Sequence, residues 1–179
     1  VMPDGRLNFT PTRVDHWRGH IPDKSGNAYF AVGEGDIWLG KSGSGTVARK
    51  RLVDGYLPIV IAEYAPAAQS EPGLKYEQTA VAWSEGMSPD EPLWAFIRLK
   101  VSNSGDRPRD VEVTWCTDSG VGPDRKVRKV AARKLALAAG AEETVYGKLP
   151  FLDGHEKAEA SSAEEFERRL GEAAGPVTV

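Results

Sequence analysis

The stretch that decides the fold is Pro92–Trp115, PLWAFIRLKVSNSGDRPRDVEVTW. In its first half, apolar side chains occupy every second position, at Leu93, Ala95, Ile97, Leu99 and Val101. This alternation predicts a strand with one buried face. Residues 103–108 (NSGDRP) have the composition of a turn, and the alternation resumes over 111–115. We therefore predict an antiparallel hairpin at the centre of a β-sandwich.

Other stretches of the chain repeat this pattern. Further strands are predicted for residues 28–32, 36–39, 46–52, 57–64, 74–83 and 144–149. Residues 127–138 contain helix-forming residues but alternate at their end, so we interpret them as half of a second hairpin. We expect Ile59 and Ile61 to lie between the two sheets, together with Leu99 and its neighbours. The predicted fold class is all-β: an antiparallel β-sandwich, supersandwich or Ig-like, with a short C-terminal helix.

By composition the chain divides into three segments. Residues 1–27 are rich in Pro, Gly, Asp and Arg, and we interpret them as an N-terminal arm or loop. Residues 28–152 form the sandwich, and residues 153–179 form a linker with a short helix. Ser162 and Glu165 have the spacing of a capping box, which predicts where this helix begins. So short a helix is marginal alone and must dock on the sandwich or on another domain.

Composition and charge exclude several classes of partner. The 179 residues are enough for one domain with a core that needs no disulfides. The net charge of −3 gives no general attraction to nucleic acid or to anionic membranes, so we expect neither. No apolar run approaches the roughly 20 residues that span a bilayer.

The single cysteine, Cys116, excludes an internal disulfide and argues against a closed zinc site. Because the sequence begins at Val1, we expect a fragment or a processed form. The compartment stays open, with a periplasmic or secreted location favoured over a cytoplasmic one.

Three motifs suggest chemistry that their context argues against. Residues 35–42 (GDIWLGKS) match the P-loop pattern, but Ile-Trp-Leu favours a strand, and residues 43–45 (GSG) would break the helix that a P-loop requires. His16 and His20 have helical metal-ligand spacing beside Gly19 and Pro22, which disfavour a helix, and His155 stands alone. The basic run over 125–134 lacks interleaved aromatic residues and indicates a solvated strand face. We expect no cofactor, no metal and no nucleic acid.

No catalytic residue can be assigned. Cys116 has no recognisable base, and carboxylate pairs such as Glu63 and Glu77 could meet only across a sheet. Trp83 and Trp94 are the candidate ligand-binding residues, because they fall on faces opposite the main apolar stripes, where indole rings can stack on sugars. The other interpretation is that a second layer covers this face, since large apolar patches rarely stay bare.

Three segments resemble parts of a known β-domain: residues 73–82 (GLKYEQTAVA), 96–106 (FIRLKVSNSGD) and 135–140 (LALAAG). Together they resemble the N-terminal supersandwich, or galactose-mutarotase-like, domain of six-hairpin glycosidases. This resemblance implies a domain that precedes an (α/α)6 catalytic toroid, on which the family's catalytic carboxylates lie. The expected function is a non-catalytic domain of a carbohydrate-active protein that packs on or assists a catalytic domain. The alternative is a stand-alone carbohydrate-binding or Ig-like interaction module.

Overall fold

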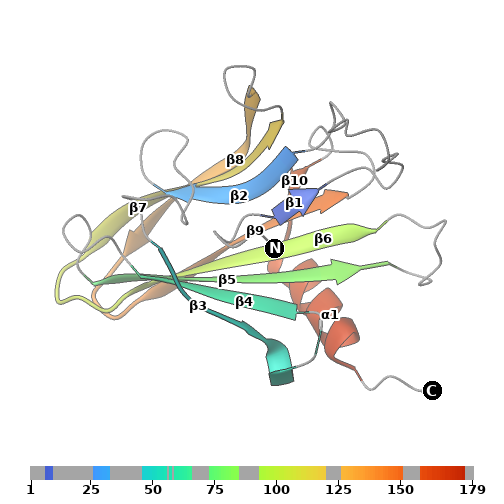
Figure 1. The fold of residues 1–179 in the computed structure, drawn as a ribbon. Coiled ribbons are helices and arrows are strands. Elements are labelled where there is room, and N and C mark those ends of the chain that lie inside the picture. The colour runs from blue at the N-terminus through green and yellow to red at the C-terminus, as the bar shows by residue number, and fades with distance from the viewer. Residues whose placement is uncertain are drawn as a thin grey trace.

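The structure is a computed structural model, which describes residues 7–9, 26–32, 46–55, 57, 59–65, 73–84, 93–119, 126–150 and 158–175. Among these residues two antiparallel sheets face each other, and one helix packs on the outside of the larger sheet (Figure 1). The fold is an all-β sandwich with a short C-terminal helix, which confirms the predicted fold class. The predicted strand at 36–39, the P-loop pattern and the three histidines lie outside the described residues.

The larger sheet has the strand order β10-β9-β6-β5-β4-β3. Its strands, in chain order, are β3 (Thr46–Leu52), β4 (Ile59–Ala65), β5 (Leu74–Trp83), β6 (Trp94–Asn103), β9 (Glu142–Pro150) and β10 (Glu159–Ala160). The smaller sheet has the order β1-β2-β7-β8. It is built from β1 (Leu7–Phe9), β2 (Gly26–Val32), β7 (Arg109–Ser119) and β8 (Lys126–Leu137). The remaining elements are a 3-10 turn (Val53–Gly55) and helix α1 (Ala163–Ala174).

The core lies between the two sheets, as the alternation predicted. Its members from the two central strands are all buried: Ile97, Leu99 and Val101 from β6, and Val111, Val113 and Trp115 from β7. Trp115 packs against Phe30 of β2, with ring centroids 5.0 Å apart. Gly147 of β9 makes room for this indole, because a Cβ at that position would lie 2.7 to 2.9 Å from the Trp115 ring. Trp115 and Gly147 therefore interlock the two sheets at the centre of the core.

The predicted central hairpin is wrong in one respect. Both strands exist, but β6 pairs with β5 and β9, whereas β7 pairs with β2 and β8. Residues 104–108 thus form an arch that carries the chain from one sheet to the other. The second predicted hairpin is also an arch, because β8 belongs to the smaller sheet and β9 to the larger. Alternation shows which side chains are buried. It does not distinguish two strands paired in a hairpin from two strands joined by an arch, because both have the same alternating pattern.

Asn103 ties the two arches together. Its buried side chain donates hydrogen bonds to the carbonyl oxygens of Arg107, Leu137 and Ala138, at 2.8, 3.2 and 3.1 Å. Its Oδ1 accepts from the N–H of Gly105 at 3.1 Å, a local bond that asparagine often makes in turns. Its main chain bonds the second arch, with the Gly140 N–H donating to its carbonyl at 2.9 Å. One polar side chain thus satisfies backbone groups of both arches.

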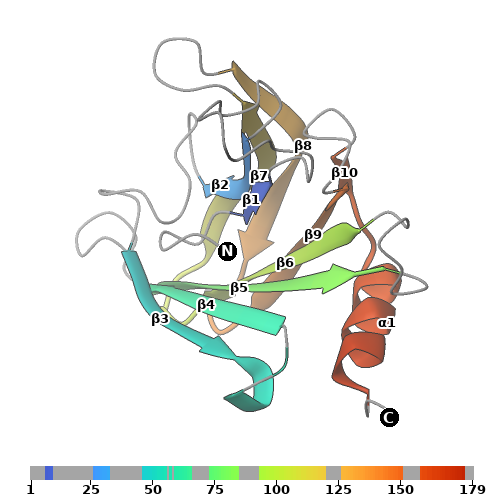
Figure 2. The same ribbon diagram turned by 45° about the vertical axis from the view of Figure 1, so that its right-hand side comes forward.

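The outer face of the larger sheet carries α1 (Figure 2). The predicted N-cap begins the helix, since the Glu165 N–H donates to Ser162 Oγ at 3.1 Å, but the Glu165 carboxylate accepts from Ser161 Oγ and does not complete a capping box. Phe166 is the buried anchor, in a cluster with Ile59 of β4 and Val81 of β5. The position expected for Ile59 and Ile61 is therefore wrong: both are buried, but they share the parity that faces outward, while Ala62 and Tyr64 face the core.

Candidate functional site

Trp83 and Trp94, the residues selected from the sequence, lie side by side on the outer face of the larger sheet. They are cross-strand partners at the ends of β5 and β6, and both are partly buried in the cluster under α1. A cation lies over each ring: Arg169 is 5.4 Å from the Trp83 centroid, and Lys148 is 5.5 Å from that of Trp94. Such contacts stabilise a cation against an indole ring. The two rings are thus engaged within the chain itself.

Ion pairs fix α1 over this aromatic surface. Glu167 accepts a hydrogen bond of 2.8 Å from Arg98, whose guanidinium also lies 5.1 Å from the centroid of the Phe166 ring. Glu165 accepts from Lys148 Nζ at 3.1 Å and from Ser161 Oγ at 2.9 Å. Partial burial would raise the pKa of Glu165, but the hydrogen bonds from Lys148 and Ser161 outweigh it and hold the pKa below its ordinary value. The helix is docked by aromatic packing and by charge together.

The helix leaves some polar groups beneath it unsatisfied. Trp83 Nε1 and Arg98 Nε are buried and have no hydrogen-bond partner. A buried donor without a partner costs free energy, and the interior of the sandwich contains one as well, Trp115 Nε1. The aromatic surface is nevertheless covered, and the described residues present no open platform of tryptophans.

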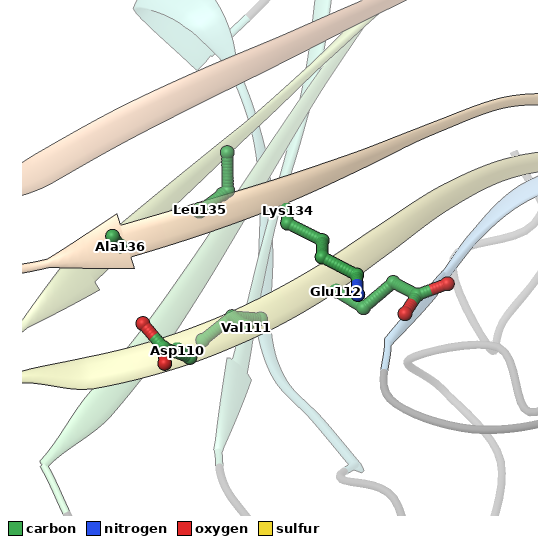
Figure 3. A pocket seen from close by; sticks show the side chains of 6 residues that line it. All are labelled: Asp110, Val111, Glu112, Lys134, Leu135 and Ala136. Carbon is green, nitrogen blue, oxygen red and sulfur yellow. The ribbon is translucent and has the colours of Figure 1, made fainter.

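A pocket of about 420 Å³ lies on the other sheet, along β7 and β8 (Figure 3). Its exposed lining residues pair across the two strands, Asp110 with Ala136 and Glu112 with Lys134. Figure 3 shows Glu112 and Lys134 reaching out from neighbouring strands. None of the three charged residues forms a hydrogen bond or an ion pair within the described part of the chain.

This pocket is suited to binding a polar ligand. Its volume falls in the range of about 300–1,000 Å³ that is typical of small-molecule sites. Two carboxylates can accept hydrogen bonds and the lysine can donate them, while Ala136 leaves space beside Asp110. Sequence reasoning missed these residues, although Asp110 and Glu112 occupy the polar positions of the alternation. The signal that could have found them is the pairing of β7 with β8, which no local pattern displays.

The other candidate residues from the sequence, Glu63, Glu77 and Cys116, all make contacts within the fold. Glu63 and Glu77 do meet across the sheet, as cross-strand partners of β4 and β5, and Arg51 lies 3.6 and 3.8 Å from their carboxylates. Cys116 is fully buried, in a cluster with Tyr29 and Ala31. The described residues contain no group of three or more His, Cys, Asp or Glu side chains placed to hold a metal ion.

Comparisons of the chain with family models, with curated proteins and with solved structures gave no match. Within the described ranges, no helix has both the length and the apolar character needed to cross a membrane. The function is therefore inferred from the residues and their geometry.

Proposed function

We propose that the chain is a non-catalytic β-sandwich domain of a carbohydrate-active protein of the six-hairpin glycosidase type. In this proposal it packs on, or assists, an (α/α)6 catalytic domain. The observation that carries the non-catalytic part is the packing of α1 over Trp83 and Trp94. Because the chain's own helix covers these rings, they act as packing residues and not as a sugar platform. The link to carbohydrate rests on the resemblance of residues 73–82, 96–106 and 135–140 to that family.

The setting of the pocket carboxylates supports a non-catalytic role. A carboxylic acid that works as a general acid near neutral pH is usually kept protonated by burial or by a neighbouring carboxylate. Asp110 and Glu112 are both exposed, and the residue opposite Glu112 on the facing strand is Lys134. This arrangement suits hydrogen bonding to a ligand better than proton transfer to it.

A second candidate function is a binding module, either for carbohydrate or for a protein. It is favoured by the pocket between β7 and β8, whose three charged side chains are unengaged within the described residues. In this version Asp110, Glu112 and Lys134 bind the ligand, and Trp83 and Trp94 keep their packing role.

One set of variants separates these functions. The chain is titrated with a panel of neutral and acidic oligosaccharides by calorimetry, and glycoside hydrolysis is assayed in parallel. For the packing domain we expect no saturable binding and no hydrolysis, and Trp94→Ala should lower the free energy of unfolding. Binding that Asp110→Asn abolishes while Trp94→Ala leaves it intact would favour the module. Hydrolysis lost in Glu112→Gln would contradict both proposals.

A further inference from the structure

The strand β8 has an unusual charge. Its 12 residues, KVRKVAARKLAL, include five Lys or Arg residues and no carboxylate. The whole chain has a net charge of −3, so this strand is a local reversal of the overall sign. The sequence indicated a solvated strand face here, and the structure confirms that most of the strand is exposed: only Leu135 and Leu137 are buried.

The position of β8 at the end of the smaller sheet leaves one of its edges without a paired strand among the described residues. It is the last strand of the smaller sheet, and its only described neighbour in that sheet is β7. Its main contacts with the six-stranded sheet are to β9 and to the short edge strand β10, which Figure 2 shows beside it. An edge strand presents a row of main-chain N–H and C=O groups that can pair with another chain. The exposed part, residues 126–134, would extend about 30 Å at about 3.3 Å per residue.

Three of the five cations of β8 have no partner among the described residues. Arg133 pairs with Glu143 at 3.3 Å and donates to the Thr144 carbonyl at 3.1 Å. In contrast, Lys126, Lys129 and Lys134 form no hydrogen bond or ion pair that the described structure contains. The opposite edge of the sandwich differs: β3 is also basic, but its Arg51 is held by Glu63 and Glu77.

We propose that the open edge of β8 binds an acidic, extended segment of a partner protein, which adds to the smaller sheet as a further antiparallel or parallel strand. Lysine on an edge strand normally prevents pairing with neutral or basic strands. The same charge selects an acidic strand, because carboxylates reduce the repulsion while the main chain supplies the pairing. Lys129 lies opposite Cys116 and Lys126 opposite Ser119, so cations project from both faces of the strand. An acidic strand beside them would meet cations on each face.

This inference does not depend on the proposed function, and two labelled peptides test it. The first has about ten residues that alternate glutamate with threonine or valine, matched to the exposed length of the strand. The second has the same charge but proline in place of threonine and valine, which removes half of its main-chain donors and disfavours regular strand pairing. By fluorescence anisotropy we expect the first peptide to bind roughly tenfold more tightly, with affinity falling as salt increases. Hydrogen exchange should slow at β8 amides only with the first peptide.

Charge-reversal variants locate the site. Lys129→Glu should weaken binding of the alternating peptide by roughly fivefold or more, because it repels the added strand. The matched control is Lys75→Glu, which changes the net charge equally at an exposed position on β5, a strand paired on both sides. The control should leave the affinity within about twofold, since distant exposed charges are screened by salt.

Three results would overturn the proposal. The first is an absence of binding by the alternating peptide. The second is equal binding of the proline peptide or of an oligonucleotide of equal charge without amide protection, which would make β8 a general polyanion surface. The third is an equal loss of affinity in Lys75→Glu and Lys129→Glu, which would make the attraction a property of net charge alone.

Discussion

The two faces of the six-stranded sheet are built on different principles. The inner face carries Ile97 and Leu99, which are fully buried against the other sheet, and Gly147, which makes room for Trp115. The outer face is divided: its aromatic half lies under α1, and its charged half holds ion pairs such as Lys100–Glu142 at 3.2 Å. Shape complementarity between apolar groups therefore dominates on one face, and packing combined with charge on the other.

This difference teaches which contacts define the fold and which ones add a layer to it. Contacts on the inner face join strands from both sheets, so losing one affects the whole sandwich. Contacts on the outer face join the sheet to a single helix, so losing one can release that helix while both sheets persist. The following predictions test this contrast.

The largest expected effect is on the inner face. Trp115→Ala should lower the free energy of unfolding by about 3–5 kcal/mol, because it removes a fully buried indole from between the sheets. Its counterpart Trp94→Ala, on the outer face and partly buried, should cost about 1–2 kcal/mol. Urea denaturation followed by circular dichroism measures both. Equal losses of unfolding free energy in the two variants would mean that the inner and outer faces contribute equally to the stability of the sandwich.

The next effect concerns the arches. Asn103→Ala should cost about 2–3 kcal/mol, because it removes the buried side chain's hydrogen bonds to the Arg107 and Leu137 carbonyls and from the Gly105 N–H. The control is Ser104→Ala, which loses one exposed hydrogen bond of 2.8 Å to Gly73 and should cost less than about 1 kcal/mol. Thermal unfolding of the two variants gives the comparison. A loss at Asn103 no greater than that at Ser104 would contradict the role of Asn103 in joining the arches.

The third prediction is that alanine substitutions at two glycines change the free energy of unfolding in opposite directions. Gly147→Ala should destabilise by about 1–3 kcal/mol, because the added methyl overlaps Trp115. Gly171→Ala, at an open position in α1, should stabilise the helix by up to about 1 kcal/mol, because alanine loses less backbone entropy. In differential scanning calorimetry, the midpoint of unfolding should therefore fall in Gly147→Ala and rise in Gly171→Ala. Tolerance of alanine at Gly147 would mean that the sheets are not interlocked there.

The smallest effect is the pH dependence of helix docking. The hydrogen bonds from Lys148 and Ser161 lower the pKa of Glu165 against the opposing effect of burial. A carboxyl whose folded pKa is lowered stabilises fully above its unfolded pKa, and its contribution is lost as pH falls through the folded value. Docking of α1 should therefore weaken as pH decreases below 4.5, seen as a change in tryptophan fluorescence. In Glu165→Gln this component of the pH profile should be absent.

Local pattern was enough to predict most of the described strands and the cap of the helix, because each depends on neighbours in sequence. The alternation over 93–101 predicted that Ile97 and Leu99 lie in the core, and both are fully buried. Ser162 and Glu165 placed the first turn of α1 correctly. The burial of Ile59 was also predicted, but on the wrong face, because strand β4 is apolar on both sides and its parity alone does not say which layer covers it.

What could not be predicted depends on which strands are neighbours. An arch and a hairpin use the same turn residues and the same alternation, so residues 103–108 did not show that β6 and β7 belong to opposite sheets. The pocket could not be predicted for the same reason, because Glu112 and Lys134 become partners only through the pairing of β7 with β8. The roles of Trp83 and Trp94 likewise depended on where α1 docks, which is a tertiary contact.

The arches have a consequence for how the chain is made. Synthesis releases β6 well before β9, its neighbour in the sheet, and β7 and β8 come between them on the other layer. A nascent chain that has reached β8 therefore exposes one edge of β6 and the apolar inner face around it. The core is complete only when the last central strand has left the ribosome, and until then the exposed apolar surface and the unpaired strand edge favour aggregation. For this protein that moment comes with Gly147, the residue that receives the Trp115 indole.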